Sequence, residues 1–116
     1  MNKKVAIFAF NGEAMCFAHA LLNAKDMKKK GYDIKLVIEG TATKQIKDLS
    51  DQGKPFANLY KEIKEDKLID CVCQACSTAT GSLDSAKEQH LPICNEMSGH
   101  PSISRYRDEG YDVIVF

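Results

Sequence analysis

Five short apolar runs alternate with segments of helical periodicity, and this alternation constrains the fold of the 116-residue chain more than any other feature. The apolar runs cover residues 5–10, 34–38, 68–73, 91–94 and 111–116. Continuous apolar runs of this length are typical of parallel strands that are buried on both faces. Strands that alternate with helices form α/β proteins with right-handed crossovers. We therefore expect one domain, residues 1–116, folded as a three-layer α/β/α sandwich around a mostly parallel five-stranded sheet.

The segments between the apolar runs carry the start and stop signals of helices. Gly31 is placed to end the first helix, and Thr41 to cap the second. Pro101 and Gly110 bracket the last helix at its first position and just past its end. By these signals and by the spacing of apolar residues, the predicted helices span residues 13–30, 42–49, 56–63, 74–80 and 101–109.

The first predicted helix, residues 13–30, is apolar around nearly its whole circumference. A helix of this kind is usually buried on more than one side. The sheet covers one side, and a chain this small has little else to cover the other. We therefore expect self-association through residues 13–30, with surface tolerance of the many small alanines as the alternative.

The balance of charge and the short apolar runs exclude several classes of function. Sixteen basic residues match sixteen acidic ones, so the clustered positive charge of a nucleic-acid-binding protein is missing. No apolar run approaches the roughly 18 residues of a membrane span, and the first run is too short for the core of a signal peptide. We expect a cytoplasmic protein that contacts neither membrane nor nucleic acid directly. The five unevenly spaced cysteines are then expected to be reduced.

Three of the five cysteines fall within six positions, at the end of the third apolar run. Cys73 ends the predicted strand, and Cys76 falls in the first turn of the following helix. The amino end of a helix favours thiolate, which is the reactive form of cysteine. We therefore predict Cys73 as the reactive thiol and Cys76 as a resolving or relay thiol. Cys71, inside the strand, is interpreted as a small buried residue.

Other polar side chains are expected beside these thiols, because ligands of parallel α/β sheets bind outside the carboxyl ends of the strands. His19 and His90 are instead interpreted as surface or interface residues, and Cys16, on the first predicted helix, is not selected as functional. The candidate residues of a pocket at this edge are Asn11, Gly12, Thr41, Cys94, Asn95 and His100.

Three other interpretations compete with a reactive Cys73. Cys73-Gln-Ala-Cys76 is a CxxC motif of the kind that begins zinc sites, but no second CxxC or HxxxH completes it. The same pair could cycle as a dithiol. The edge pocket could also bind a small molecule without turnover. No GxGxxG or P-loop follows the first strand, so no nucleotide is expected, and we predict neither a metal nor another cofactor.

The chain resembles the DsrE/DsrF-like (YchN-like, TusD-related) family of small sulfur-relay proteins. The resemblance rests on the first strand with its alanine-rich helix, on Cys73 eight residues before Gly81, and on the closing segment 110–116. It implies a parallel α/β/α sandwich, homo- or hetero-oligomers such as trimers or hexamers, and a persulfide on Cys73. Sulfur would pass between donor and acceptor proteins, so the chain is at most a carrier or sulfurtransferase-like protein. The extra Cys71, Cys76 and Cys94 depart from the simplest single-cysteine pattern.

Overall fold

The structure of the chain, a computed structural model, describes residues 3–116, so the first two residues of the expected domain lie outside the description. Within these residues five strands form one sheet, and every neighbouring pair is parallel. The predicted α/β fold is confirmed. In the order in which they lie side by side, the strands are β4 (Ile93–Cys94), β3 (Ile69–Cys73), β2 (Asp33–Ile38), β1 (Lys4–Ala9) and β5 (Asp112–Val115).

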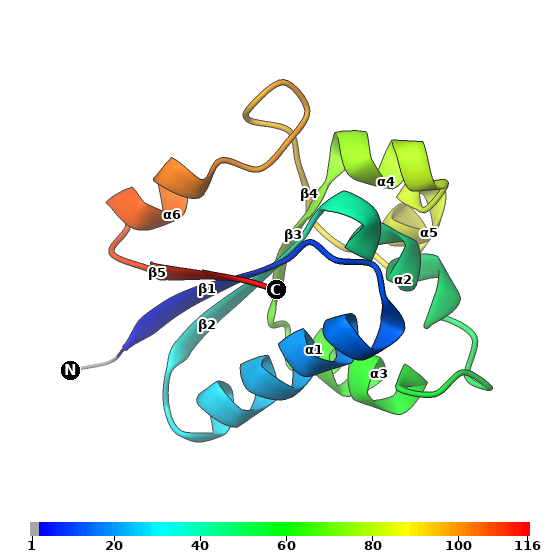
Figure 1. Cartoon of the computed structure of the whole chain (residues 1–116), viewed down its shortest axis with the longest axis horizontal. Helices are drawn as coiled ribbons and strands as arrows, with labels where there is room; N and C mark the ends of the chain where they lie inside the picture. Colours follow the sequence, from blue (N-terminus) through cyan, green and yellow to red (C-terminus); the bar gives the residue numbers. More distant parts are fainter. Residues whose placement is uncertain (1–2) are drawn as a thin grey trace.

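Helices flank the sheet (Figure 1). α1 and α3 pack against each other on one side, and α6 lies on the other side near β5. α4 begins directly where β3 ends, which places its first turn at the carboxyl edge of the sheet. The helical elements are α1 (Ala14–Lys29), the 3-10 turn η1 (Gly40–Thr43), α2 (Lys44–Asp48), α3 (Ala57–Glu65), α4 (Gln74–Thr80), α5 (Leu83–Glu88) and α6 (Ile103–Asp108).

Two separate apolar cores occupy the two faces of the sheet. Successive residues of a strand point to opposite faces, so Ile7 of β1 joins the core with Phe17 of α1 and Ile63 of α3. Phe8 joins the second core with Tyr106 of α6. Full burial of a large apolar side chain contributes about 1.5–3 kcal/mol relative to exposure. Burial on both faces is the reason that the strands read as continuous apolar runs.

Three local predictions were wrong. The Thr41 hydroxyl does not cap a helix; its Oγ1 accepts a hydrogen bond from the Gly12 amide at 2.8 Å, which ties two loops together. α5 was missed, because its six residues are too few to show a helical period. The last helix begins at residue 103 rather than at Pro101, since Ser102 still has extended backbone angles.

α1 presents one face to the sheet and another to solvent in the single chain. Its buried residues are Phe17, Ala18, Ala20, Leu21 and Ala24. Met15 is 61% exposed and Leu22 is 49% exposed, and the two lie about two helical turns apart on the outer face. Neither α1 nor another helix within residues 3–116 has the length and apolar character that crossing a membrane requires.

Candidate functional site

Cys73 is the last residue of β3 and also the N-cap of α4. Its backbone is extended, and its Sγ accepts a hydrogen bond from the Cys76 amide at 3.3 Å. The Ser77 hydroxyl donates to the Cys73 carbonyl oxygen at 2.7 Å. A strand that runs directly into a helix therefore holds the thiol at the first turn, as the sequence predicted.

Three sulfur and nitrogen atoms converge at this point. Cys73 Sγ lies 3.0 Å from Cys76 Sγ and 3.1 Å from His100 Nδ1. Cys76 Sγ lies 3.5 Å from the same nitrogen. The three residues thus form a compact cluster, here called the thiol–imidazole cluster. Two predicted reactive thiols and one of the predicted pocket residues are brought together, although 24 positions separate Cys76 from His100.

The loop between β4 and α6 brings His100 to the thiols. The Ala75 amide donates to the Gly99 carbonyl at 3.0 Å, and Cys73 Sγ donates to the same carbonyl at 3.5 Å. Within the loop, Met97 and His100 exchange backbone hydrogen bonds of 2.8 and 2.9 Å. Gly99 has a φ of +92°, which an L residue adopts only at a cost. The position of the imidazole therefore depends on a glycine turn that is bonded to the start of α4.

Cys73 is fully buried, whereas Cys76 and His100 are half-buried. Burial raises the pKa of the Cys73 thiol to about 12, and the hydrogen bond to Cys76 and the charges of Cys76 and Glu39 act in the same direction. The Cys76 amide opposes them. The direction of this pKa shift is opposite to the one expected of a thiol at a helix start, because desolvation outweighs one backbone donor.

Glu39 belongs to the surroundings of the cluster, and the sequence reasoning did not select it. It directly follows β2, the strand beside β3. Desolvation raises the pKa of its carboxyl group, and the charge of His100 lowers it. The glutamate is thus close enough for its charge to act on both His100 and Cys73. Its place at a strand end was visible in the sequence, but the order of the strands was not.

Cys71 and Cys94 form a disulfide between β3 and β4. Strand pairing places Cys94 opposite Cys73, and Cys71 lies two residues earlier on the same face of β3. Cys71 and Cys94, which are 23 positions apart in the sequence, thus come within bonding distance. The expectation that all cysteines are reduced was therefore wrong for this pair. Cys71 is buried as predicted, and its Sγ lies 3.4 Å from the Tyr106 hydroxyl. The free cysteines among residues 3–116 are Cys16, Cys73 and Cys76.

The remaining predicted pocket residues make their hydrogen bonds in two other places. Asn11 Oδ1 accepts from the Glu13 amide at 2.9 Å, beside the contact between Gly12 and Thr41. Asn95 Nδ2 donates to Gln74 Oε1 at 3.0 Å, next to the start of α4. The carboxyl edge of the sheet thus carries one group of polar residues around β1 and β2 and another around β3 and β4.

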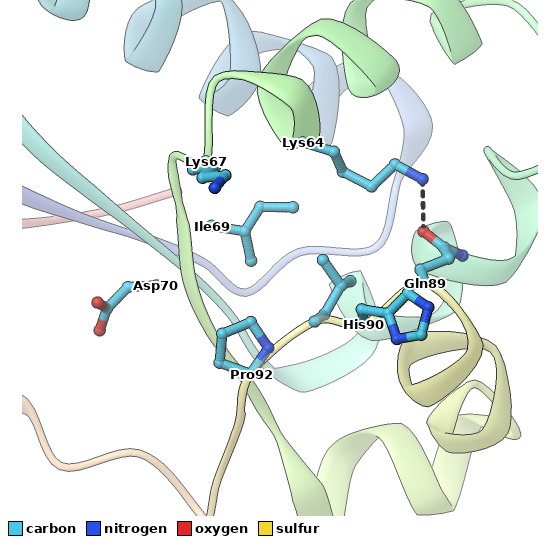
Figure 2. A pocket seen from close by; sticks show the side chains of 8 residues that line it. Lys64, Lys67, Ile69, Asp70, Gln89, His90 and Pro92 are labelled. Carbon is cyan, nitrogen blue, oxygen red and sulfur yellow. Dashed lines mark hydrogen bonds between the residues drawn. The ribbon is translucent and has the colours of Figure 1, made fainter.

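A cavity of about 420 Å³, shown in Figure 2, is lined by residues from the beginning of β3, the end of the strand opposite to the thiols. Ile69, the first residue of β3, lines it, while Cys73 is the last residue of the same strand. Lys64 Nζ donates to Gln89 Oε1 at 3.0 Å beside the cavity, and the exposed His90 lines it as well. This cavity and the thiol–imidazole cluster are separate features.

A sequence profile of the DsrE/DsrF-like family matches residues 1–116. An uncharacterized protein of Methanocaldococcus jannaschii is 33% identical over 96 residues, which are 83% of this chain and 76% of that protein. An uncharacterized protein of Archaeoglobus fulgidus is 51% identical over 43 residues, which are 37% of this chain and 70% of that protein. The chain belongs to the DsrE/DsrF-like family.

Proposed function

We propose that the chain is a sulfur carrier that holds a persulfide on Cys73 and passes it between partner thiols. Membership of the DsrE/DsrF-like family is consistent with sulfur relay. The observation that carries the proposal is the convergence of Cys73, Cys76 and His100 within 3.0–3.5 Å at the carboxyl edge of the sheet. Two thiols and a base in contact are the groups that thiol exchange needs.

The transfer conserves atoms and electrons at each step. Cys73 Sγ attacks the outer sulfur of a donor persulfide, R–S–SH, and the bond between the two donor sulfurs breaks. The products are Cys73–S–SH and the donor thiol, R–SH. His100 Nδ1, 3.1 Å from Cys73 Sγ, is placed to carry the proton from the attacking thiol toward the leaving sulfur. An acceptor thiol then attacks the outer sulfur of Cys73–S–SH, and Cys73 leaves with a proton.

Access of the donor to Cys73 is the main requirement of this mechanism. Cys76 and His100 are half-buried and lie in front of a Cys73 that solvent does not reach. A donor that docks at this edge meets the 95–100 loop and the first turn of α4 first. We infer that docking opens the 95–100 loop enough to expose the Cys73 sulfur while His100 stays in contact with it, and that an isolated chain reacts slowly.

Persulfide mapping by intact-mass spectrometry tests the proposal. The full chain is treated with a small persulfide donor, such as glutathione persulfide, in the presence of a metal chelator. We expect the addition of one sulfur atom, removable by dithiothreitol, and its loss in Cys73→Ala. Cys16→Ala is the matched control, because Cys16 is a free but exposed cysteine on α1. Equal loading of Cys73→Ala and the unaltered chain would refute the role of Cys73.

A dithiol redox protein is the second candidate, favoured by the 3.0 Å between the sulfurs of Cys73 and Cys76. In that case Cys76 would attack the inner sulfur of Cys73–S–SH and release hydrosulfide as the two cysteines form a disulfide. The same mass measurement separates the candidates. A carrier accumulates the added sulfur, whereas a dithiol protein loses two hydrogens and retains no sulfur. Cys76→Ala should increase the retained sulfur if Cys76 resolves the persulfide.

We also propose that α1 forms the contact between copies in a homo-oligomer. Met15 and Leu22, on its outer face, are 61% and 49% exposed in the single chain. Large apolar side chains that cluster on a surface are typical of protein contacts. Sedimentation of the unaltered chain should show a species larger than the monomer, and Leu22→Lys should shift it toward the monomer. A monomer throughout the micromolar range would contradict the proposal.

A further inference from the structure

The thiol–imidazole cluster has the composition and size of a transition-metal site. Each of its three residues offers one ligand atom, and the three atoms lie 3.0, 3.1 and 3.5 Å apart. Within residues 3–116 these three residues form a group whose ligand atoms could hold one ion. We propose that Cys73, Cys76 and His100 bind one thiophilic metal ion of the zinc type, with a fourth ligand position left open.

The distances fit one face of a tetrahedron. With metal–ligand bonds of about 2.0–2.3 Å, the ligand atoms of a tetrahedral zinc site are roughly 3.3–3.8 Å apart. The triangle formed by the three ligand atoms is slightly smaller than this. The atoms must therefore move apart by less than about 1 Å to reach the spacing of a tetrahedral site. Cys73 and Cys76 also have the CxxC spacing that zinc sites commonly use.

The disulfide explains why the site would have three protein ligands rather than four. Cys94 lies opposite Cys73 in the strand pairing and would be the nearest candidate for a fourth thiolate, but it is bonded to Cys71. Structural zinc sites are closed by four protein ligands, whereas three protein ligands leave a position for water or a substrate. The cluster therefore matches the open kind of site, in which an incoming thiol can bind the ion.

The surroundings fix the ligands in advance. The Cys76 amide contacts Cys73 Sγ at 3.3 Å, and the Ala75 amide holds the loop before His100 through Gly99 at 3.0 Å. His100 presents Nδ1 to both sulfurs, which leaves Nε2 as the protonated nitrogen when the ring is a ligand. Two thiolates would neutralise a divalent ion once their protons are released on binding.

An ion at this site would change the proposed sulfur transfer. Cys73 Sγ would be a metal ligand and could no longer attack a donor persulfide, so metal and sulfur would compete for one atom. This consequence rests on the proposed carrier function, but binding of the ion itself does not. Sulfur loading is measured with a chelator present, and metal binding is measured without a sulfur donor. Each proposal can therefore fail while the other stands.

Cobalt absorption spectroscopy tests the site. The full chain, kept reduced with a phosphine, is titrated with Co²⁺ and then with competing Zn²⁺. We expect one equivalent of Co²⁺ to produce thiolate-to-cobalt charge transfer and tetrahedral d–d absorption, both removed by Zn²⁺. Loss of even an outer-shell partner costs metal sites about 10–100-fold in affinity, so Cys76→Ser and His100→Ala should each weaken Zn²⁺ binding by at least about 100-fold.

Two control variants locate the ligands. Cys16→Ser removes a free cysteine outside the cluster, and the double variant Cys71→Ala with Cys94→Ala removes the thiols that the phosphine can release from the disulfide. Both should retain the cobalt spectrum. Circular dichroism establishes that each variant is folded. An unaltered chain without thiolate charge transfer, undiminished Zn²⁺ affinity in Cys76→Ser and His100→Ala, or loss of the spectrum in a folded double variant would overturn the proposal.

Discussion

Replacing Gly99 by alanine should damage the candidate site through the backbone alone. Gly99 has a φ of +92°, and a Cβ built on it would lie 3.1 Å from the Cβ of Ala75. Its carbonyl oxygen accepts hydrogen bonds from the Ala75 amide and from the Cys73 sulfur. A shift of this residue therefore moves His100, the next residue, away from the thiols without removing any reactive group.

Two terms make up the expected loss of stability. A left-handed backbone costs an L residue about 1–2 kcal/mol. Crowding of a packed contact costs about 1–3 kcal/mol more. The distance of 3.1 Å between the added Cβ and the Cβ of Ala75 is only slightly shorter than an ordinary van der Waals contact, so the crowding is mild. We expect Gly99→Ala to lower the free energy of unfolding by about 2–4 kcal/mol. At roughly 4 °C for each kcal/mol, the midpoint of thermal unfolding falls by roughly 8–16 °C.

Gly31→Ala is the matched control. Gly31 has nearly the same φ, +90°, but a Cβ on it would meet nothing within 4 Å. Gly31→Ala should therefore lower the free energy of unfolding only by the cost of the left-handed backbone, about 1–2 kcal/mol. In the Gly99→Ala background, Ala75→Gly should recover part of the additional loss, because it removes the crowded carbon. Urea denaturation of the four proteins measures the two terms separately.

The thiols report the local effect. Alkylation of Cys73 by iodoacetamide, followed by mass spectrometry under native conditions, should be faster in Gly99→Ala than in Gly31→Ala. The reason is that His100 and the Gly99 carbonyl no longer cover the sulfur. If the two variants have the same stability and the same alkylation rate, the glycine turn does not hold the cluster together, and the reasoning is refuted.

Two further predictions concern buried tyrosines. Tyr106→Phe should lower the free energy of unfolding by about 1–3 kcal/mol, as measured by urea denaturation. The reason is that the buried Tyr106 hydroxyl donates to Asp70 at 2.5 Å, and the carboxylate would lose that partner. An unchanged urea midpoint would contradict this prediction. Burial raises the pKa of Tyr60, Tyr106 and Tyr111, the last to about 12. The folded chain thus keeps protons that the unfolded chain releases above about pH 10, so stability should fall as the pH rises from there. A urea midpoint that is constant or rising over that range would argue against these shifts.

Much of the candidate site could be read from short segments of sequence. A strand that ends in cysteine and runs into a helix is a local pattern, so the position of Cys73 at the carboxyl edge was predictable. The contact of Cys76 with Cys73 follows from the same turn. His100 was predicted for this edge because it follows another strand of the same parallel sheet. Its distance from the sulfurs was not predictable, since it depends on the glycine turn at residue 99.

The errors arose where distant segments meet. Whether Cys71 and Cys94 bond depends on the pairing of β3 with β4, and no local pattern records which strands are neighbours. The ionisation of Cys73 was predicted from the helix end alone, whereas burial is the larger influence on its pKa. Burial of a residue is a property of everything packed around it. Glu39 was missed for the same reason, because it reaches the site from an adjacent strand.

The order of residues along this chain determined its elements, because apolar runs and turn residues act over a few positions and each strand or helix forms from its own segment. The same order determined that thiols stand at a strand end, since that is a matter of local geometry. Tertiary structure decided which sulfur is bonded, which is buried and which contacts an imidazole. Those outcomes depend on segments 20 to 30 positions apart that only the packed sheet brings within a few ångströms of one another.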